Sequence, residues 1–241
     1  PVGNDLPGWP LNFDDHWMIN APAIADVDGD GMLDIVTGER VASAQGFVHA
    51  IKMDGTPINA NWPVEVLATP AFTPSIGDVD NDGNPDVVIA ASSAGMYIFD
   101  NQGQVFPGFP VVDPNVKYSY QSPMLADLDG DGGQDILVPL ITGNVNTEYL
   151  LIMSGEAGYV VASREVSGYG LDPVVPGLFV AQARSSAIEH FASFYTWNGE
   201  ALDLEASVSI TFDDNGNSTC TLATGAVGRG EEFYCDAVMS E

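Results

Sequence analysis

The chain has 241 residues, of which 34 are acidic and six are basic, so its formal net charge is −28. This charge argues against nucleic acid and anionic membranes as partners, because both are polyanions. No apolar run approaches the roughly 20 residues of a membrane-spanning helix, so membrane insertion is not expected. The chain starts without an initiator Met or a signal peptide, which indicates a mature or trimmed form of a secreted protein.

Four similar units follow one another along the chain, with a period of about 50 residues that is typical of repeat architectures. Each unit is expected to contain a proline, a loop, a buried strand, a second strand and a turn with glycine. The prolines are Pro22, Pro74, Pro123 and Pro173. The second strands read FVHAIKM, MYIFD, YLLIM and FASFYTW, and the turns are Asp54-Gly55, Gln102-Gly103, Ser154-Gly155 and Asn198-Gly199. Aromatic–proline pairs, expected to pack between units, stand at Trp9-Pro10, Trp62-Pro63 and Phe109-Pro110.

The loops of the first three units share the nine-residue pattern D-x-D-x-D-G-x-x-D, which starts at Asp26, Asp78 and Asp127. Its carboxylates are hard oxygen ligands, and Ca²⁺ accepts roughly six to eight oxygens in flexible geometry. The glycine at position 6 permits the positive φ that a sharp turn needs. Mg²⁺ is a weaker candidate, because it demands tighter octahedral geometry and keeps several waters. Three Ca²⁺ sites are therefore predicted.

The predicted ligands are the four carboxylates of each loop and the backbone carbonyl at position 7. They are Asp26, Asp28, Asp30, the Met32 carbonyl and Asp34; then Asp78, Asp80, Asp82, the Asn84 carbonyl and Asp86; then Asp127, Asp129, Asp131, the Gly133 carbonyl and Asp135. An EF-hand does not fit, because position 12 needs glutamate and is here Thr37, Ile89 or Val138. The segments after the loops are short, apolar and β-branched, so they are predicted to be strands.

The segments AIADVDGDGMLDIVTG, SIGDVDNDGNPDVVIA and MLADLDGDGGQDILVP resemble the FG-GAP/VCBS repeats of integrin α-chain heads and of secreted bacterial proteins. The resemblance covers roughly residues 1–200 and implies an all-β fold, a β-propeller whose calcium loop joins the first two strands of each blade. About four blades are expected, as a complete small propeller, part of a larger one, or a half that pairs with another chain. The fourth unit has lost the carboxylates in its expected loop, LFVAQARSSAIEH, and is predicted to bind no metal.

Residues 1–205 are expected to form the repeats, and residues 206–241 a C-terminal extension outside the blade period. Cys220 and Cys235 are the two cysteines of the chain, and they are predicted to form a disulfide in an oxidising compartment. The disulfide would pin a β-hairpin in which Ala206–Cys220 pairs with Glu232–Met239. Asn217 begins a glycosylation sequon, which has meaning only in a eukaryote.

No catalytic constellation stands out, so whether the chain is an enzyme is left open. His49 lies inside a predicted strand and is interpreted as structural, whereas His16 follows two aspartates near the first loop. Exposed aromatic residues on connections are candidates for a ligand surface: Trp17, Tyr118 and Tyr120.

The favoured function is a noncatalytic, calcium-stabilised module for adhesion or recognition, secreted or on the cell surface, that binds a glycan or an extracellular protein. One alternative is a fragment of a polysaccharide lyase-type enzyme. A second is a structural subunit of a surface assembly, which would self-associate through propeller edges or the C-terminal hairpin.

Overall fold

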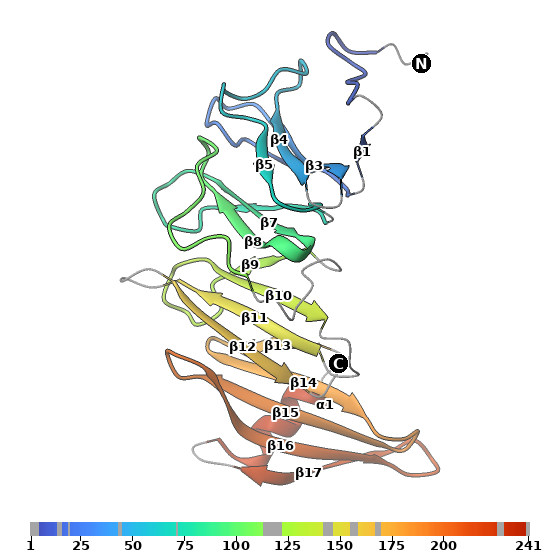
Figure 1. The fold of residues 1–241 in the computed structure, drawn as a ribbon. Helices are drawn as coiled ribbons and strands as arrows, with labels where there is room; N and C mark the ends of the chain where they lie inside the picture. Colours follow the sequence, from blue (N-terminus) through green and yellow to red (C-terminus); the bar gives the residue numbers. More distant parts are fainter. Residues whose placement is uncertain are drawn as a thin grey trace. The chain divides into compact units, whose positions relative to one another are not determined.

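The structure is a computed structural model that describes residues 5–13, 16–18, 20–42, 45–70, 72–112, 122–141, 147–154, 159–166, 170–225 and 229–239. Within these ranges it consists of four antiparallel β-sheets, one short 3₁₀ turn and one α-helix (Figure 1). The described residues include no helix that is long and apolar enough to cross a membrane.

The first two sheets are formed by the first two units. The first sheet has the order β1-β3-β4-β5, with β2 also paired to β3. Its strands are β1 (Trp17–Met18), β2 (Ala23–Ala25), β3 (Asp34–Ala42), β4 (Gln45–Ile51) and β5 (Val64–Val66). The second sheet has the order β6-β7-β8, formed by β6 (Ser75–Gly77), β7 (Asp86–Ala91) and β8 (Gly95–Phe99), with the 3₁₀ turn η1 (Ser92–Ala94) between the last two.

The other two sheets follow in chain order. The third has the order β12-β11-β10-β9, formed by β9 (Met124–Ala126), β10 (Asp135–Ile141), β11 (Thr147–Met153) and β12 (Val160–Val166). The fourth has the order β13-β14-β15-β16-β17, formed by β13 (Asp172–Val175), β14 (Leu178–Arg184), β15 (Glu189–Trp197), β16 (Leu202–Phe212) and β17 (Ser218–Gly225). Helix α1 (Glu231–Met239) follows β17.

The nine-residue acidic pattern joins a short strand to a long strand in each of the first three units. Ala25 is paired with Asp34 across the first loop, and Gly77 is paired with Asp86 across the second. Position 1 of the pattern therefore follows the short strand directly, and position 9 is the first residue of the long strand. The expected placement of the loop between the first two strands of a unit is confirmed.

Apart from its four repeats, the chain divides into two compact parts. One consists of residues 1–125 with 136–142, and the other of residues 126–135 with 143–241. In the first, every residue of β7 and β8 is buried. This explains why the residues after Asp86 in β7, and those of β8, are continuously apolar rather than alternating. Trp62 belongs to this core and meets Phe99 edge to face, with the ring centroids 6.0 Å apart. The packing role predicted for the aromatic–proline segments is confirmed at this residue.

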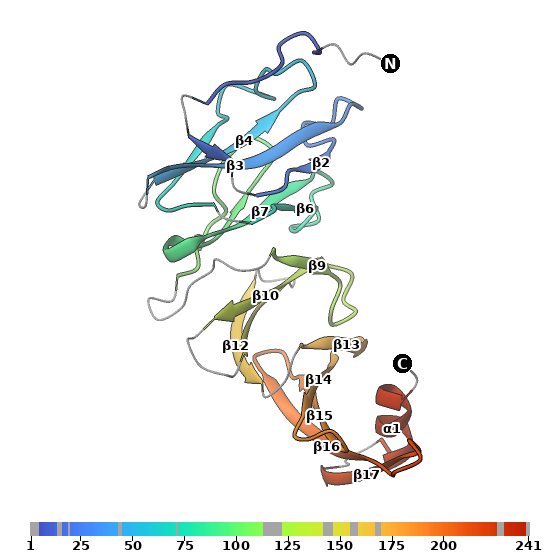
Figure 2. The same ribbon diagram turned by 90° about the vertical axis from the view of Figure 1, so that its right-hand side faces the viewer.

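The second core lies between the fourth sheet and helix α1 (Figure 2). Tyr234 of the helix is fully buried, and its ring lies 4.8 Å from that of Phe194 on β15. The predicted strand 191–197 is confirmed within β15, which pairs with β14 on one side and β16 on the other.

The predicted loop of the fourth unit is wrong. Most of LFVAQARSSAIEH is strand β14, and the position of the acidic loop is taken by a tight turn at Pro176-Gly177, where Gly177 has φ 73°. The reason is local: proline and glycine favour a tight turn, and the β-branched and aromatic residues after it favour a strand.

The predicted partner of the C-terminal hairpin is also wrong, because Glu231–Met239 is helical and β16 pairs with β17 instead. The hairpin turn lies at Asp213–Gly216, where the Asp213 carboxylate accepts hydrogen bonds from the backbone N–H groups of Asn215 (2.9 Å) and Asn217 (2.8 Å). Two glutamates in the first turn of α1 stabilise the positive end of the helix dipole.

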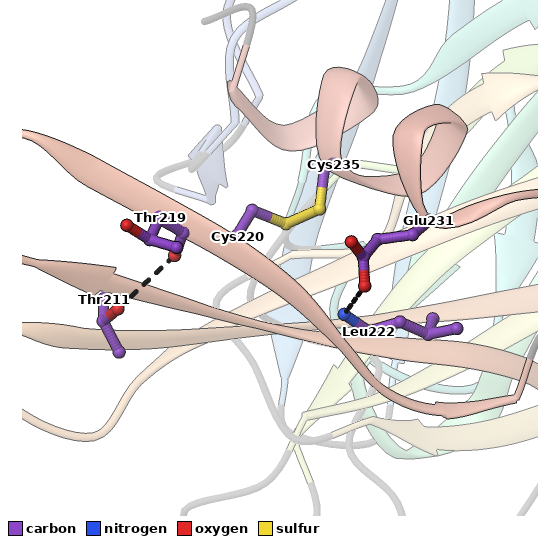
Figure 3. The surroundings of a disulfide bond; sticks show 6 residues. All are labelled: Thr211, Thr219, Cys220, Leu222, Glu231 and Cys235. Atoms are coloured by element: carbon purple, nitrogen blue, oxygen red, sulfur yellow. Dashed lines mark hydrogen bonds between the residues drawn. A yellow bond between two sulfur atoms is a disulfide. The ribbon is translucent and has the colours of Figure 1, made fainter.

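The predicted disulfide is present and joins Cys220 on β17 to Cys235 on α1, with the two Cα atoms 5.7 Å apart (Figure 3). Beside it, the Glu231 carboxylate accepts a hydrogen bond of 2.9 Å from the backbone N–H of Leu222. The disulfide therefore ties a helix, and not a second strand, to the last strand of the fourth sheet.

Candidate metal centres

Each acidic loop brings three carboxylates together. The ligand atoms at positions 1, 3 and 9 lie within 4.8 Å of one another in all three loops: Asp26, Asp28 and Asp34; Asp78, Asp80 and Asp86; Asp127, Asp129 and Asp135. Nine of the predicted side-chain ligands thus converge in groups of three. The converging oxygens come from both ends of one hairpin loop, an arrangement that could hold a cation.

The aspartate at position 9 of each pattern anchors the loop to the sheet. Asp34, Asp86 and Asp135 are almost fully buried, with exposures of 1%, 2% and 0%. One oxygen of each accepts a hydrogen bond from the backbone N–H of position 2: Val27 (3.0 Å), Val79 (2.8 Å) and Leu128 (2.7 Å). The side chains at position 2 are themselves buried in the core. Their role was not predicted from the sequence, although an apolar residue recurs at position 2 in all three loops.

Position 6 shows the positive φ that its glycine predicts. The φ angles are 85° at Gly31, 90° at Gly83 and 95° at Gly132. In each loop the backbone N–H of this glycine donates to the aspartate at position 1, over 2.9, 2.9 and 3.2 Å. The left-handed turn therefore fixes the direction of the first carboxylate.

Position 4 also needs a left-handed backbone, which sequence analysis missed. Gly29, Asn81 and Gly130 have φ angles of 74°, 60° and 86°. Asparagine tolerates this region better than other residues with a Cβ. The residue types at this position, Gly, Asn and Gly, are those that favour a left-handed backbone.

The aspartate at position 5 of each loop lies outside these clusters of three. Its carboxylate accepts a hydrogen bond from the backbone N–H of position 7, over 2.8 Å in the first loop, 2.7 Å in the second and 2.8 Å in the third. This Asx turn shapes the loop. The ligand roles predicted for Asp30, Asp82, Asp131 and the carbonyls of position 7 stay predictions.

The carboxylates crowded in these loops have perturbed pKa values. Burial raises the pKa of Asp86 to about 7, and the neighbouring Asp80, Asp82 and Asp78 add to the rise. Burial also raises the pKa of Asp34 and Asp135. Buried carboxylates that repel one another are stabilised by a nearby positive charge.

The donor set fits a hard divalent cation. All the converging atoms are carboxylate oxygens, which suit Ca²⁺ and Mg²⁺ better than the softer transition metals. In the first loop, the described residues provide no hydrogen-bond partner for the buried Oδ1 atom of Asp26. That oxygen has a free lone pair for a metal.

The first loop contacts Lys52, and no such contact is seen at the other two loops within the described part of the chain. The Lys52 ammonium lies 2.6 Å from Asp28 Oδ2 and 2.7 Å from Asp30 Oδ2. These hydrogen bonds, first that to Asp28, raise the pKa of Lys52, so the side chain stays charged. The bond to Lys52 in turn lowers the pKa of Asp30.

Trp17 is the one predicted ligand-surface residue among those that the structure describes, since Tyr118 and Tyr120 lie outside them. Its side chain on β1 is 64% exposed, and the Arg40 guanidinium lies 5.5 Å from the ring centroid. Both residues line a hollow of about 210 Å³ together with His16, Val41 and Ala42. The hollow thus presents an aromatic ring and one cationic side chain.

His16 and His49 share a buried acidic partner that sequence analysis did not identify. Glu39 on β3 accepts a hydrogen bond from His16 Nδ1 through one oxygen, and its other oxygen lies 2.6 Å from His49 Nε2. Burial lowers the pKa of His49 despite this hydrogen bond. The structural role predicted for His49 agrees with its position between Glu39 and the ring of Phe13, whose centroid is 4.8 Å away. Asp14 and Asp15 lie outside the described residues.

Residues 78–138, which span the second and third acidic loops, match the family described as FG-GAP-like repeat. Integrin alpha-4 of Xenopus laevis is 27% identical over 141 residues, and the match covers 49% of this chain. The chain spans 14% of the length of that integrin.

Two solved structures are similar at 14% identity. One is a Xanthomonas type IV secretion system related protein, with a TM-score of 0.37 over 83% of this chain and 92% of that one. The other is BBS1N in complex with ARL6DN, with a TM-score of 0.38 over 89% of this chain and 71% of that one. Scores this low do not identify a fold.

An all-β chain of antiparallel sheets, each of the first three opened by an acidic hairpin loop, is a repeat protein of the β-propeller class. Residues 78–138 of this chain carry FG-GAP-like repeats, and part of the chain is similar to an integrin α-chain.

Proposed function

We propose that the chain is a noncatalytic recognition module for adhesion outside the cell, stabilised by Ca²⁺ in its three acidic loops. The observation that carries the proposal is the convergence of three carboxylates in each loop of FG-GAP-like repeats. The likeness to an integrin supports a role in binding an extracellular partner.

The proposed ligands are those that the sequence predicts at positions 1, 3, 5, 7 and 9 of each loop. Ca²⁺ supplies positive charge that offsets the repulsion among the carboxylates. The chain itself contributes the left-handed turns at positions 4 and 6, which aim the side chains, and the buried ninth aspartate, which fixes the loop to its strand. Ca²⁺ is favoured over Mg²⁺ because these hairpin loops offer many oxygens and no rigid octahedral cage.

The disulfide between Cys220 and Cys235 supports a secreted or cell-surface location. Disulfides persist in oxidising compartments and are rare in the cytosol. Extracellular calcium modules can bind their ion weakly, with dissociation constants of roughly 0.1–1 mM, because free Ca²⁺ is abundant there.

The proposed partner is an extracellular protein or a glycan, bound at the surface around Trp17. An exposed aromatic ring beside a guanidinium suits either, since both residue types are enriched at energetic centres of interfaces. Residues 1–205 are proposed to form the repeats of a small propeller and residues 206–241 an extension. Strands β16 and β17 of that extension complete the fourth sheet. Self-association through exposed strand edges is part of this proposal.

The test is a binding screen of the purified chain on a glycan array and on a panel of extracellular proteins, with Ca²⁺ and with EDTA. We expect binding that requires Ca²⁺ and weakens by at least tenfold in Trp17→Ala. The matched control is Phe191→Ala, which removes a partly exposed aromatic residue from β15 in the fourth sheet. Turnover of an anionic polysaccharide would contradict the noncatalytic assignment, and binding unchanged by EDTA would contradict the calcium requirement.

A further inference from the structure

Among the residues that the structure describes, the first acidic loop is the one whose carboxylates form ion pairs with a cationic side chain. Lys52 follows the last residue of β4, and its ammonium bridges two of the predicted ligands, Asp28 and Asp30, at 2.6 and 2.7 Å. Its side chain is 32% exposed, so the contact is partly shielded from water. The ammonium therefore competes for carboxylate oxygens that a metal ion in this loop would use.

The residue after the second strand of a unit is different in the other two loops. After β8 it is Asp100, whose carboxylate accepts backbone hydrogen bonds from Gln102 (2.9 Å) and Gln104 (2.7 Å) in its own turn. After β11 it is Ser154, whose backbone N–H donates to Asp135 Oδ1 over 2.7 Å. Neither residue carries positive charge, so the second and third loops lack this form of compensation.

We propose that Lys52 is a resident cation that makes the first loop the weakest of the three metal sites, so that it fills last. This inference rests on the proposed binding of Ca²⁺. Entry of the ion would have to break both ion pairs of Lys52 and would leave an ammonium beside a divalent cation. Because the lysine is partly exposed, we expect a penalty of roughly ten- to a hundredfold in affinity.

A consequence is that the three loops respond differently when metal is removed. The first loop keeps one positive charge among its carboxylates, whereas the second and third lose all compensation from the metal. The first hairpin would therefore stay ordered in EDTA, while the other two loosen. Stepwise filling would let the chain sense a higher Ca²⁺ concentration than the one that stabilises its second and third units.

The experiment is a calcium titration by isothermal calorimetry, with the number of bound ions counted by native mass spectrometry. The wild-type chain should show two tight sites and one that is at least tenfold weaker. Lys52→Met should convert the weak site into a third tight site, because it keeps the length of the side chain and removes its charge. Lys52→Gln serves the same purpose if Lys52→Met does not fold.

Three matched variants locate the effect. Lys52→Arg keeps the charge and should behave as the wild type. Asp26→Asn, which alters the first loop without removing a partner of Lys52, should abolish the weak event and leave both tight ones. Arg184→Gln removes a positive charge from the β14–β15 hairpin, where Arg184 Nε donates a hydrogen bond to the backbone carbonyl of Ser186. This variant should change none of the three sites.

Three sites of equal affinity in the wild type, unchanged in Lys52→Met, would overturn this inference and leave the proposed function intact. The same holds if Asp26→Asn deletes a tight site. Absence of calcium binding in the wild type and in Lys52→Met would overturn the proposed function, and this inference with it.

Discussion

Individual residues in the acidic loops divide into those that aim carboxylates and those that supply them. Asn81 and Gly83 give the second loop its two left-handed turns, and Val79 links it to the core through its buried side chain and its hydrogen bond to Asp86. The ionised form of Asp86 is destabilised by this arrangement, because its carboxylate is buried beside three other acidic side chains.

Asp86 should make the metal-free protein less stable as the pH rises. Its pKa is about 7 in the folded chain and roughly 3.9 in an unfolded one, so the native state binds more protons between these values. The free energy of unfolding in EDTA should therefore fall from about pH 4 to about pH 7. Denaturant titrations across this range should show the fall, and Asp86→Asn should reduce it.

Asp82→Asn is the comparison for this prediction. It removes one charge that adds to the raised pKa of Asp86 but leaves Asp86 buried, so it should reduce the fall less than Asp86→Asn does. With saturating Ca²⁺ the trend should reverse, because the metal needs the deprotonated carboxylate. A pH profile in EDTA that is identical for the wild type and Asp86→Asn would show that Asp86 is not the titrating group.

At the scale of single elements, helix α1 depends on what it packs against. It has nine residues, fewer than the roughly 12–15 that an isolated helix needs to be stable in water. Two anchors hold it on the fourth sheet: the disulfide to β17, and the buried ring of Tyr234, whose hydroxyl donates to Glu205 over 2.5 Å. Arg229 closes the cluster through its ion pair with Glu205, at 2.7 Å.

Replacing both cysteines by serine should lower the free energy of unfolding by roughly 3 kcal/mol, the value for a closed loop of about 15 residues. Because Tyr234 still fills the second core, the helix should remain docked. Chemical denaturation measures the loss, and far-ultraviolet circular dichroism follows the helix. Adding a reductant to the wild type should reproduce the loss of stability. The same reductant should not change the stability of the double variant. Equal stability of the oxidised wild type and the double variant would contradict the stabilising role of the disulfide.

For the whole molecule, the dominant quantity is the net charge of −28. Self-repulsion of this size disfavours the compact state, and salt screens it over roughly 10 Å at 0.1 M. Binding of three Ca²⁺ would neutralise part of the charge at the places where it is most crowded.

The melting temperature should therefore fall in EDTA and recover with Ca²⁺ more than with Mg²⁺. Each site that is filled at one hundred times its dissociation constant should add about 2.7 kcal/mol. Raising NaCl from about 20 mM to about 500 mM should stabilise the EDTA-treated chain more than the calcium-loaded one. Differential scanning calorimetry with elemental analysis tests both effects. If EDTA leaves the melting temperature unchanged and elemental analysis finds no bound metal, the calcium assignment is refuted.

Features that depend on neighbours along the chain were predictable from the sequence. The acidic loops, their glycines at position 6 and the strands on both sides arise within one hairpin, where short-range turn chemistry decides the structure. The Cys220–Cys235 pair was predictable because the chain has two cysteines, so one intramolecular pairing is possible.

Features that depend on distant segments were decided by the tertiary structure. Lys52 reaches Asp28 and Asp30 because β4 returns beside β3, and Glu39 meets both His16 and His49 because three segments converge there. The residues of α1 were predicted as a strand, but a buried Tyr234 and the disulfide select a helix against the fourth sheet. Local pattern determines what each loop can hold, whereas packing determines which charges and side chains come to lie beside it, because packing free energy depends on residues far apart in the chain.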